Sequence, residues 1–117
     1  MELPTVTNRT TAPHYIWGSD DCDGWRLLDT AGLSVIEEWM PPQSHELRHF
    51  HRAATQLFYV LEGHLAIEVA QETHHLGPGD AMPVLPPTPD QVRNDSADDA
   101  RFLVISAPAT TNDRQTT

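Results

Sequence analysis

Short runs of β-prone, apolar residues recur along the middle of the chain, and turn residues separate them. The run at 65–69, for example, alternates apolar and other side chains directly after the Glu62-Gly63 turn, as a strand with one buried face does. No segment keeps the apolar period of an amphipathic helix. Several short strands spaced by turns are typical of an all-β sandwich or barrel. The predicted strands cover residues 33–40, 45–51, 56–61, 65–69, 73–76, 81–85, 90–94 and 101–106.

The chain has 117 residues, a length that suits one domain around one hydrophobic core. We predict a single domain over residues 1–117, with its core at about 33–106 and no internal repeat. Residues 1–13 are rich in Thr and contain two prolines, which predicts an irregular N-terminal arm. Residues 107–117 are predicted to form a polar tail.

The charge of the chain excludes several classes of function. It has 17 Asp and Glu against 7 Arg, with no Lys, and a formal net charge of -10. Such a balance argues against nucleic acids and anionic membrane surfaces as partners, and the absence of Lys excludes Schiff-base chemistry. Cys22 is the single cysteine, so no intrachain disulfide can form. Without a signal-peptide or membrane-spanning apolar stretch, we expect a cytoplasmic protein.

Two histidines in the run at 45–51 are the first candidates for chemistry. His49 and His51 are two residues apart, and this spacing places both side chains on one face of a strand. Two imidazoles on one face suit a metal site on a sheet. His45 has the same parity if the strand is unbroken, but we interpret it as a polar residue at the start of the strand.

The spacing around these histidines resembles the first motif of the cupin superfamily. Cupins are small β-barrels, also called double-stranded β-helices or jelly rolls, and the motif has the form G-x5-H-x-H-x3,4-E-x6-G. In this chain His49, His51, Gln56 and Gly63 match its spacing, with Gln in place of Glu. The leading glycine is replaced by the turn at 41–44.

The second cupin motif, G-x5-P-x-G-x2-H-x3-N, is similar to residues 86–94, which follow the Gly-Pro-Gly-Asp turn at 77–80. Here the internal glycine is absent, and Asp90 stands where the motif has His. The resemblance covers about residues 33–106 and implies an all-β cupin double-stranded β-helix. Residues 15–25 resemble the N-terminal segment of the members of one group of small bacterial single-domain cupins, a group that has no assigned reaction.

The resemblance implies a metal site, with a ligand set that differs from the usual three His and one Glu. Here the four positions are His49, His51, Gln56 and Asp90. An amide oxygen is an uncharged and weak ligand, while Asp90 restores the missing negative charge, and two His with one carboxylate is the facial arrangement of non-haem iron sites. We predict one divalent transition metal at these four residues, with Fe, Mn, Ni, Zn and Cu all compatible. The alternative is a metal-free barrel in which the histidines are hydrogen-bonded pocket residues.

The parity of the arginines predicts that none of them lies inside the barrel. Arg48 lies between the two inward histidines, and Arg93 differs in parity from Asp90, so both should face away and pair with acids. A strongly anionic ligand would then have little but the metal to hold it.

Two main classes of function stay open, because a fold alone does not define a reaction. One is a metal-dependent enzyme, of oxygenase, isomerase or lyase type, that acts on a small organic molecule. No catalytic residue can be assigned, although Asp90 would be a candidate general base if it is not a ligand. The other is a non-catalytic barrel that binds or senses a small ligand; a metal-free cupin remnant is a third reading. We also expect a homodimer, because pairing would bury edge strands.

Overall fold

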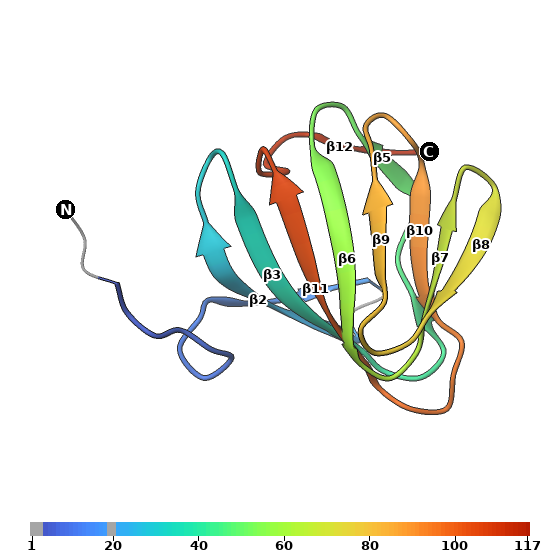
Figure 1. Cartoon of the computed structure of the whole chain (residues 1–117), viewed down its shortest axis with the longest axis horizontal. Helices are drawn as coiled ribbons and strands as arrows, with labels where there is room; N and C mark the ends of the chain where they lie inside the picture. The colour runs from blue at the N-terminus through green and yellow to red at the C-terminus, as the bar shows by residue number, and fades with distance from the viewer. Residues whose placement is uncertain (1–3, 19–20) are drawn as a thin grey trace.

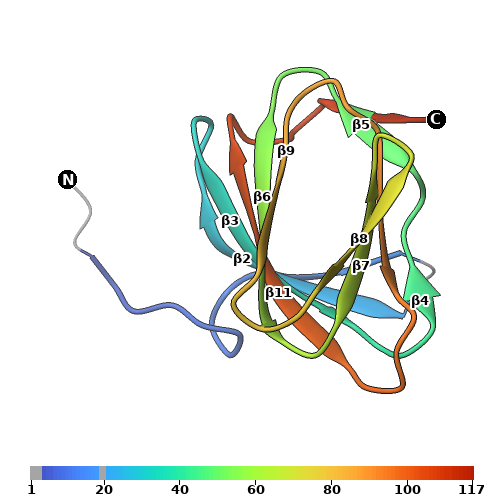
Figure 2. The ribbon, with the colours of Figure 1, turned by 45° about the vertical axis from the view of Figure 1, so that its right-hand side comes forward.

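The computed structural model describes residues 4–18 and 21–117, and shows two antiparallel six-stranded sheets that face each other (Figures 1 and 2). One sheet has the order β1-β2-β3-β11-β6-β9, and the other has the order β12-β5-β10-β7-β8 with β4 paired to β10. No helix that could span a membrane is found in the described ranges. The strands are β1 (His14–Trp17), β2 (Cys22–Asp29), β3 (Ser34–Met40), β4 (Ser44–His45), β5 (His49–His51), β6 (Thr55–Glu62), β7 (Leu65–Val69), β8 (Glu72–Leu76), β9 (Ala81–Val84), β10 (Asp90–Asn94), β11 (Ala100–Ala107) and β12 (Arg114–Thr116).

The predicted all-β architecture of two facing sheets is confirmed. The expected strands at 65–69 and 90–94 are β7 and β10 with the same bounds, and most of the others differ by one or two residues. The period-2 pattern located them because each strand buries one face against the opposite sheet.

The expected strand at 45–51 is wrong as a single element. It is broken into β4 and β5, and the residues between them leave the strand path. The break coincides with Glu46, whose backbone N–H donates to the carbonyl of Val92 (3.1 Å) while its carboxyl oxygen accepts from the Val92 N–H (3.2 Å). The parity argument therefore does not extend from His49 back to His45, which is exposed.

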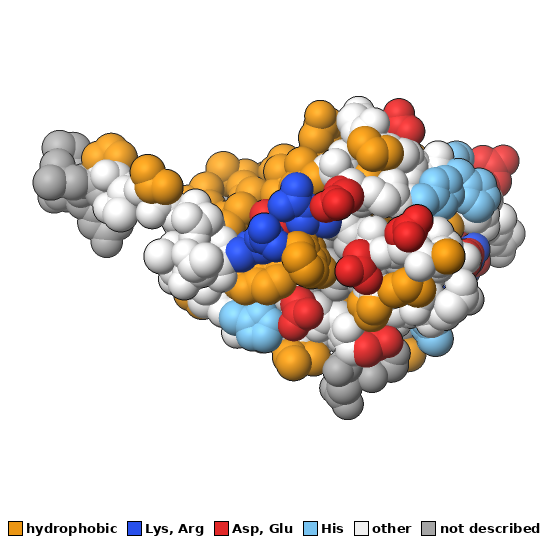
Figure 3. Space-filling view, turned by 90° about the horizontal axis from the view of Figure 1, so that it is seen from below, with side chains coloured by type: hydrophobic (Ala, Val, Ile, Leu, Met, Phe, Trp, Pro, Cys, Tyr) orange, Lys and Arg blue, Asp and Glu red, His pale blue; other side chains and the backbone are white. Residues whose placement is uncertain are grey.

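The two ends of the chain differ in how they pack. Residues 4–13 form no strand and extend away from the sheets (Figures 1 and 3), although Arg9 pairs with Glu37 of β3 (3.2 Å). Residues 1–3 of the predicted arm lie outside the described residues. The segment at 107–117, expected to be a polar tail, instead contains the strand β12, which pairs with β5. The sequence gives little sign of this strand because its pattern is polar on both faces.

Strands β6 and β11 each pass from a polar cavity at one end of the barrel to an apolar core at the other. On β6 the inward side chains Gln56 and Phe58 line the cavity, and the next inward residue, Val60, is in the core. On β11 the order is the same, from Ser106 at the cavity to the fully buried Phe102. The apolar end stabilises the barrel, which leaves the polar end available for a ligand site.

The surface of the barrel includes edge strands and scattered apolar side chains. The outermost strands of the first sheet are β1 and β9, and Ile16 of β1 is 58% exposed. Apolar and acidic side chains both lie on the face shown in Figure 3. The expected homodimer stays a prediction.

Candidate metal and ligand site

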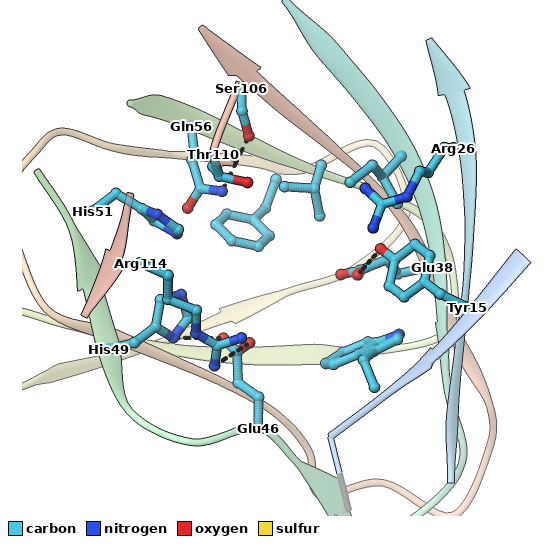
Figure 4. A pocket seen from close by; sticks show the side chains of 14 residues that line it. Tyr15, Arg26, Glu38, Glu46, His49, His51, Gln56, Ser106, Thr110 and Arg114 are labelled. Carbon is cyan, nitrogen blue, oxygen red and sulfur yellow. Dashed lines mark hydrogen bonds and ion pairs between the residues drawn. The ribbon is translucent and has the colours of Figure 1, made fainter. Parts of the chain in front are cut away.

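A cavity of about 230 Å³ lies between the two sheets, and polar side chains occupy both of its sides. Figure 4 shows His49, His51 and Arg114 on one side, and Tyr15, Arg26 and Glu38 on the other. Apolar residues such as Phe58 and Val104 complete the wall. The cavity therefore has two chemically distinct sides that face each other across a small volume.

The histidines of β5 lie together, as their spacing predicts. His49 and His51 are both buried, and their ring centroids are 5.0 Å apart with the rings nearly perpendicular. His49 Nδ1 lies 2.9 Å from the carbonyl oxygen of Leu47. Since a carbonyl only accepts hydrogen bonds, Nδ1 carries the proton and Nε2 keeps its lone pair for a metal.

Burial keeps both imidazoles neutral, which is the form that binds metals. It lowers the pKa of His49 to about 4, against a smaller opposing effect of the hydrogen bond to Leu47. It also lowers the pKa of His51, although the charge of Asp113 opposes the shift. The Nδ1 atom of His51 is buried and has no hydrogen-bond partner among the described residues.

Asp90 lies directly opposite His49, because β10 and β5 pair at these two residues. Its Oδ1 is 3.6 Å from His49 Nε2. The side chain is fully buried, and neither carboxyl oxygen finds a hydrogen-bond donor in the described chain. Burial raises the pKa of Asp90 to about 7, while Arg114 and Arg48 act in the opposite direction. An unpaired buried carboxyl group is costly unless a cation compensates it.

Gln56 presents its amide oxygen without a partner. Its Nε2 donates to the hydroxyl of Ser106 (3.1 Å), which fixes the orientation of the amide group. Its buried Oε1 has no donor among the described residues, and in Figure 4 it points away from Ser106 and toward His51. The four predicted residues thus include three with unpartnered buried atoms and a fourth, His49, with a free Nε2.

Glu46 also lies at this site, and sequence reasoning missed it. One ligand atom each of Glu46, His49 and Asp90 lies within 4.8 Å of the other two, and this group does not include His51. Glu46, however, already has partners: its Oε1 accepts from the Val92 N–H (3.2 Å), and its Oε2 is 3.9 Å from an Arg114 nitrogen. We therefore regard Glu46 as a neighbour of the metal-ligand candidates. On an unbroken strand it would have faced outward, so no sequence pattern could have revealed it.

The expectation that no arginine lies inside the barrel is wrong, because Arg114 and Arg26 line the cavity. Arg114 is on β12, opposite His51 of β5, and donates to the carbonyl of Leu47 (3.3 Å). Arg48 and Arg93 do pair with acids as expected, Arg48 with Glu68 and Arg93 with Asp95 (3.2 Å).

The strand that carries Arg114 is held in place by its neighbour Asp113. The Asp113 carboxylate accepts from the backbone N–H groups of Arg52, Ala53 and Ala54, each at 3.0 Å. Burial is the largest single influence on Asp113 and raises its pKa, but the three bonds and the nearby His51 together outweigh it and hold the pKa below its usual range. The anchor joins the end of the chain to the loop that follows the two histidines.

The opposite side of the cavity carries a hydrogen-bonded pair. The Tyr15 hydroxyl donates to Glu38 Oε2 at 2.6 Å. Burial raises the pKa of Glu38 to about 7, although the bond from Tyr15 and the charges of Arg114 and Arg26 lower it. The Tyr15 ring fits because its partner on β2 is Gly24, where a Cβ atom would lie 2.2 Å from the Tyr15 Cζ. The sequence did not reveal this pair, because β1, which carries Tyr15, was not among the predicted strands.

Two facing antiparallel sheets around a polar cavity define a double-stranded β-helix. The family model for the cupin domain matches residues 36–106. The chain therefore belongs to the cupin family, as the resemblance predicted. No curated protein matches the sequence at a significant level.

Solved structures share the fold at low sequence identity. The polyketide cyclase RemF from Streptomyces resistomycificus is 20% identical with a TM-score of 0.83, over 98% of this chain and 86% of that one. A sugar phosphate isomerase of the cupin superfamily from Silicibacter pomeroyi is 23% identical with a TM-score of 0.77, over 90% and 76%. A predicted oxalate decarboxylase from Thermotoga maritima is 16% identical with a TM-score of 0.81, over 90% and 100%. At these identities the likeness establishes the fold alone.

Cupin domains often bind a metal ion, and the donors that line this cavity fit one together with Asp90, which lies beside His49 but does not itself line the cavity. Imidazole and carboxylate groups suit divalent transition metals, and the buried Asp90 supplies the negative charge that neutral imidazoles lack. The unpartnered oxygens of Asp90 and Gln56 would gain a partner from such an ion, whereas the unbonded Nδ1 of His51 lies 3.8 Å from an Asp113 carboxyl oxygen. The cluster is thus a possible metal site, whose ion the donor types do not specify.

Proposed function

We propose that this protein is a metal-dependent enzyme that moves protons on a small organic molecule, in the manner of an isomerase or a lyase. The observation that carries the proposal is the pairing of two features across one cavity. One is the group of buried donors that includes the unpartnered Asp90 carboxyl group. The other is the hydrogen-bonded pair of Tyr15 and Glu38.

The proposed metal ligands are His49, His51, Gln56 and Asp90. Buried polar atoms in native proteins nearly always have partners, and the exceptions tend to have a functional reason. Asp90 is fully buried, with two oxygens that lack donors in the described chain. His49 offers Nε2 on the side of Asp90 because its Nδ1 is bound to the Leu47 carbonyl. A divalent cation accounts for these features together.

The residues across the cavity supply acid–base chemistry. A group with a pKa near the working pH can both accept and release a proton, and Glu38 has a pKa of about 7. The Tyr15 hydroxyl holds this carboxyl group in one orientation. A bound divalent ion would act as a Lewis acid that polarises a substrate oxygen. Glu38 would then take a proton from one substrate atom and return it to another.

The solved relatives by fold are compatible with this proposal. Their names include a polyketide cyclase, a sugar phosphate isomerase and a predicted oxalate decarboxylase, so enzymes of several kinds are named among barrels of this fold. Oxygenase chemistry does not require a carboxyl group near pKa 7 in the cavity, so the Glu38 pair favours isomerase or lyase chemistry. A non-catalytic ligand-binding barrel is the main alternative.

Proton exchange with deuterated solvent tests the proposed activity without knowledge of the substrate. Small hydroxy and oxo acids would be incubated in D₂O with the protein, either metal-stripped or loaded with Zn, Mn or Fe, and followed by proton NMR. We expect loss of a C–H signal next to a carbonyl group, or elimination of water, with the loaded protein only. A protein that binds metal and small acids but exchanges no proton would favour the non-catalytic barrel.

A further inference from the structure

We infer that Arg26 is the recognition site for a carboxylate group of the substrate. The inference names a chemical group of the substrate for the proposed function. It rests on the proposed function in one respect, which is that the substrate binds in this cavity. Arg26 lies on β2 and lines the cavity on the side that faces the histidines (Figure 4). The sequence pattern predicted no basic residue inside the barrel, so the position of Arg26 comes from the structure alone.

Arg26 differs from most of the other arginines in that it forms no ion pair at contact distance, although its charge lowers the pKa of Glu38. Acidic residues outnumber arginines by 17 to 7, so a free guanidinium group is unexpected in this chain. Among the described residues, only Arg26 and Arg52 lack an ion pair with Asp or Glu; both are exposed, but of the two only Arg26 lines the cavity. The pairs formed by the other five are Arg9–Glu37, Arg48–Glu68, Arg93–Asp95, Arg101–Glu62 and Arg114–Glu46.

The guanidinium group is nevertheless held in position. Its Cζ atom lies 4.5 Å from the centroid of the Tyr15 ring, as in a cation–π contact. The ring is itself fixed by the hydrogen bond to Glu38 and by its fit against Gly24. Stacking uses the face of the guanidinium group and leaves its N–H edge free to donate to a ligand. Arg26 is thus a preorganised donor without an acceptor.

The surroundings favour a carboxylate over a phosphate. A planar guanidinium edge matches the two oxygens of a carboxylate in a bidentate pair. Glu38 and Glu46 line the same cavity, and burial raises the pKa of both carboxyl groups, so a bound dianion would oppose their ionisation more than a monoanion would. The cavity, at about 230 Å³, is smaller than the roughly 300 Å³ at which drug-sized pockets begin. The ligand would be a small organic acid, with its carboxylate at Arg26 and its reacting end toward His49.

Binding of simple acids to Arg26 variants tests this assignment. Lactate and benzoate, both monoanions at neutral pH, would be titrated calorimetrically beside their neutral amides, with wild type, Arg26→Gln and the control Arg52→Gln. Wild type and Arg52→Gln should bind at least one acid more tightly than its amide. Arg26→Gln should lose about tenfold to a hundredfold of acid affinity, since a hydrogen bond to a charged group is lost, while amide binding should be unchanged.

A second variant and a second anion complete the test. Arg26→Lys keeps the charge but not the planar edge, so its acid affinity should be intermediate, and thermal melting would verify that each variant folds. Equal acid affinity in wild type and Arg26→Gln, or no preference for any acid over its amide, would overturn the inference. Tighter, Arg26-dependent binding of inorganic phosphate would overturn the choice of carboxylate. Titrations of metal-stripped protein separate these outcomes from failure of the proposed metal chemistry.

Discussion

Replacing both His49 and His51 by alanine should abolish the stabilisation that a divalent transition metal gives to the wild-type protein. A ligand that binds only the folded state at a thousand times its Kd stabilises that state by about 4 kcal/mol. In a domain of this size, that free energy raises the midpoint of thermal unfolding by about 15 °C. Both imidazoles are buried, and β5, which carries them, pairs with the strand of Asp90. Their removal therefore leaves no imidazole nitrogen to bind a metal at the site.

The measurement is a thermal melt of each protein with and without Zn, Mn, Ni or Fe. The quantity compared is the metal-induced shift within each variant, so a change in the stability of the metal-free protein does not affect the result. His64→Ala/His75→Ala is the matched control, because it removes two adjacent imidazoles from the surface, whose Nε2 and Nδ1 atoms are 3.2 Å apart. A shift that disappears in this control and persists in the His49/His51 variant would place the metal at the surface pair.

Replacing Glu38 by glutamine should make the metal-free protein more stable than wild type at pH 8. At pH 4 the same substitution should raise the stability much less. Burial raises the pKa of Glu38 from 4.5 to about 7. Between these values the unfolded chain releases this proton while the folded protein still holds it, so rising pH favours unfolding. The contribution of Glu38 to stability is therefore present below pH 4.5 and lost as pH rises through about 7.

The expected difference between Glu38→Gln and wild type at pH 8 is about 1–3 kcal/mol. Urea unfolding in the presence of EDTA, at intervals from pH 4 to pH 8, would measure it. The amide oxygen of Gln can still accept from Tyr15, so the geometry of the pair is retained. Glu72→Gln, at a side chain that is 80% exposed, controls for the loss of one negative charge. An identical pH dependence in Glu38→Gln and wild type would show that Glu38 titrates normally.

Much of the fold could be predicted from the sequence because the barrel strands bury one face. The alternating pattern found β7 and β10 with the observed bounds, and the cupin spacing brought Asp90 to the strand that pairs with His49. Alternation of apolar and polar residues, together with motif spacing, is sufficient to place a side chain where the strand is regular. In such a strand successive side chains face opposite sides of the sheet.

The sequence could not reveal residues whose positions depend on irregular backbone or on polar strands. Glu46 faces inward only because the chain breaks between β4 and β5. Arg114 reaches the cavity on β12, a strand with no apolar face, held by the contacts of Asp113 with the 52–54 loop. Arg26 lies on β2, a segment that the strand prediction left out. Arg26 and Arg114 make the cavity able to bind an anionic ligand, which the sequence did not lead us to expect. Both lie on strands that the hydrophobic pattern did not detect.

Anomalous diffraction from crystals of the Zn- or Mn-loaded protein would test most directly whether a metal ion binds at His49, His51, Gln56 and Asp90. We expect one anomalous peak at the side of the cavity that carries the histidines, within bonding distance of His49 Nε2 and of His51, Gln56 and Asp90. A peak at the His64 and His75 pair alone, or no peak at a saturating metal concentration, would contradict it.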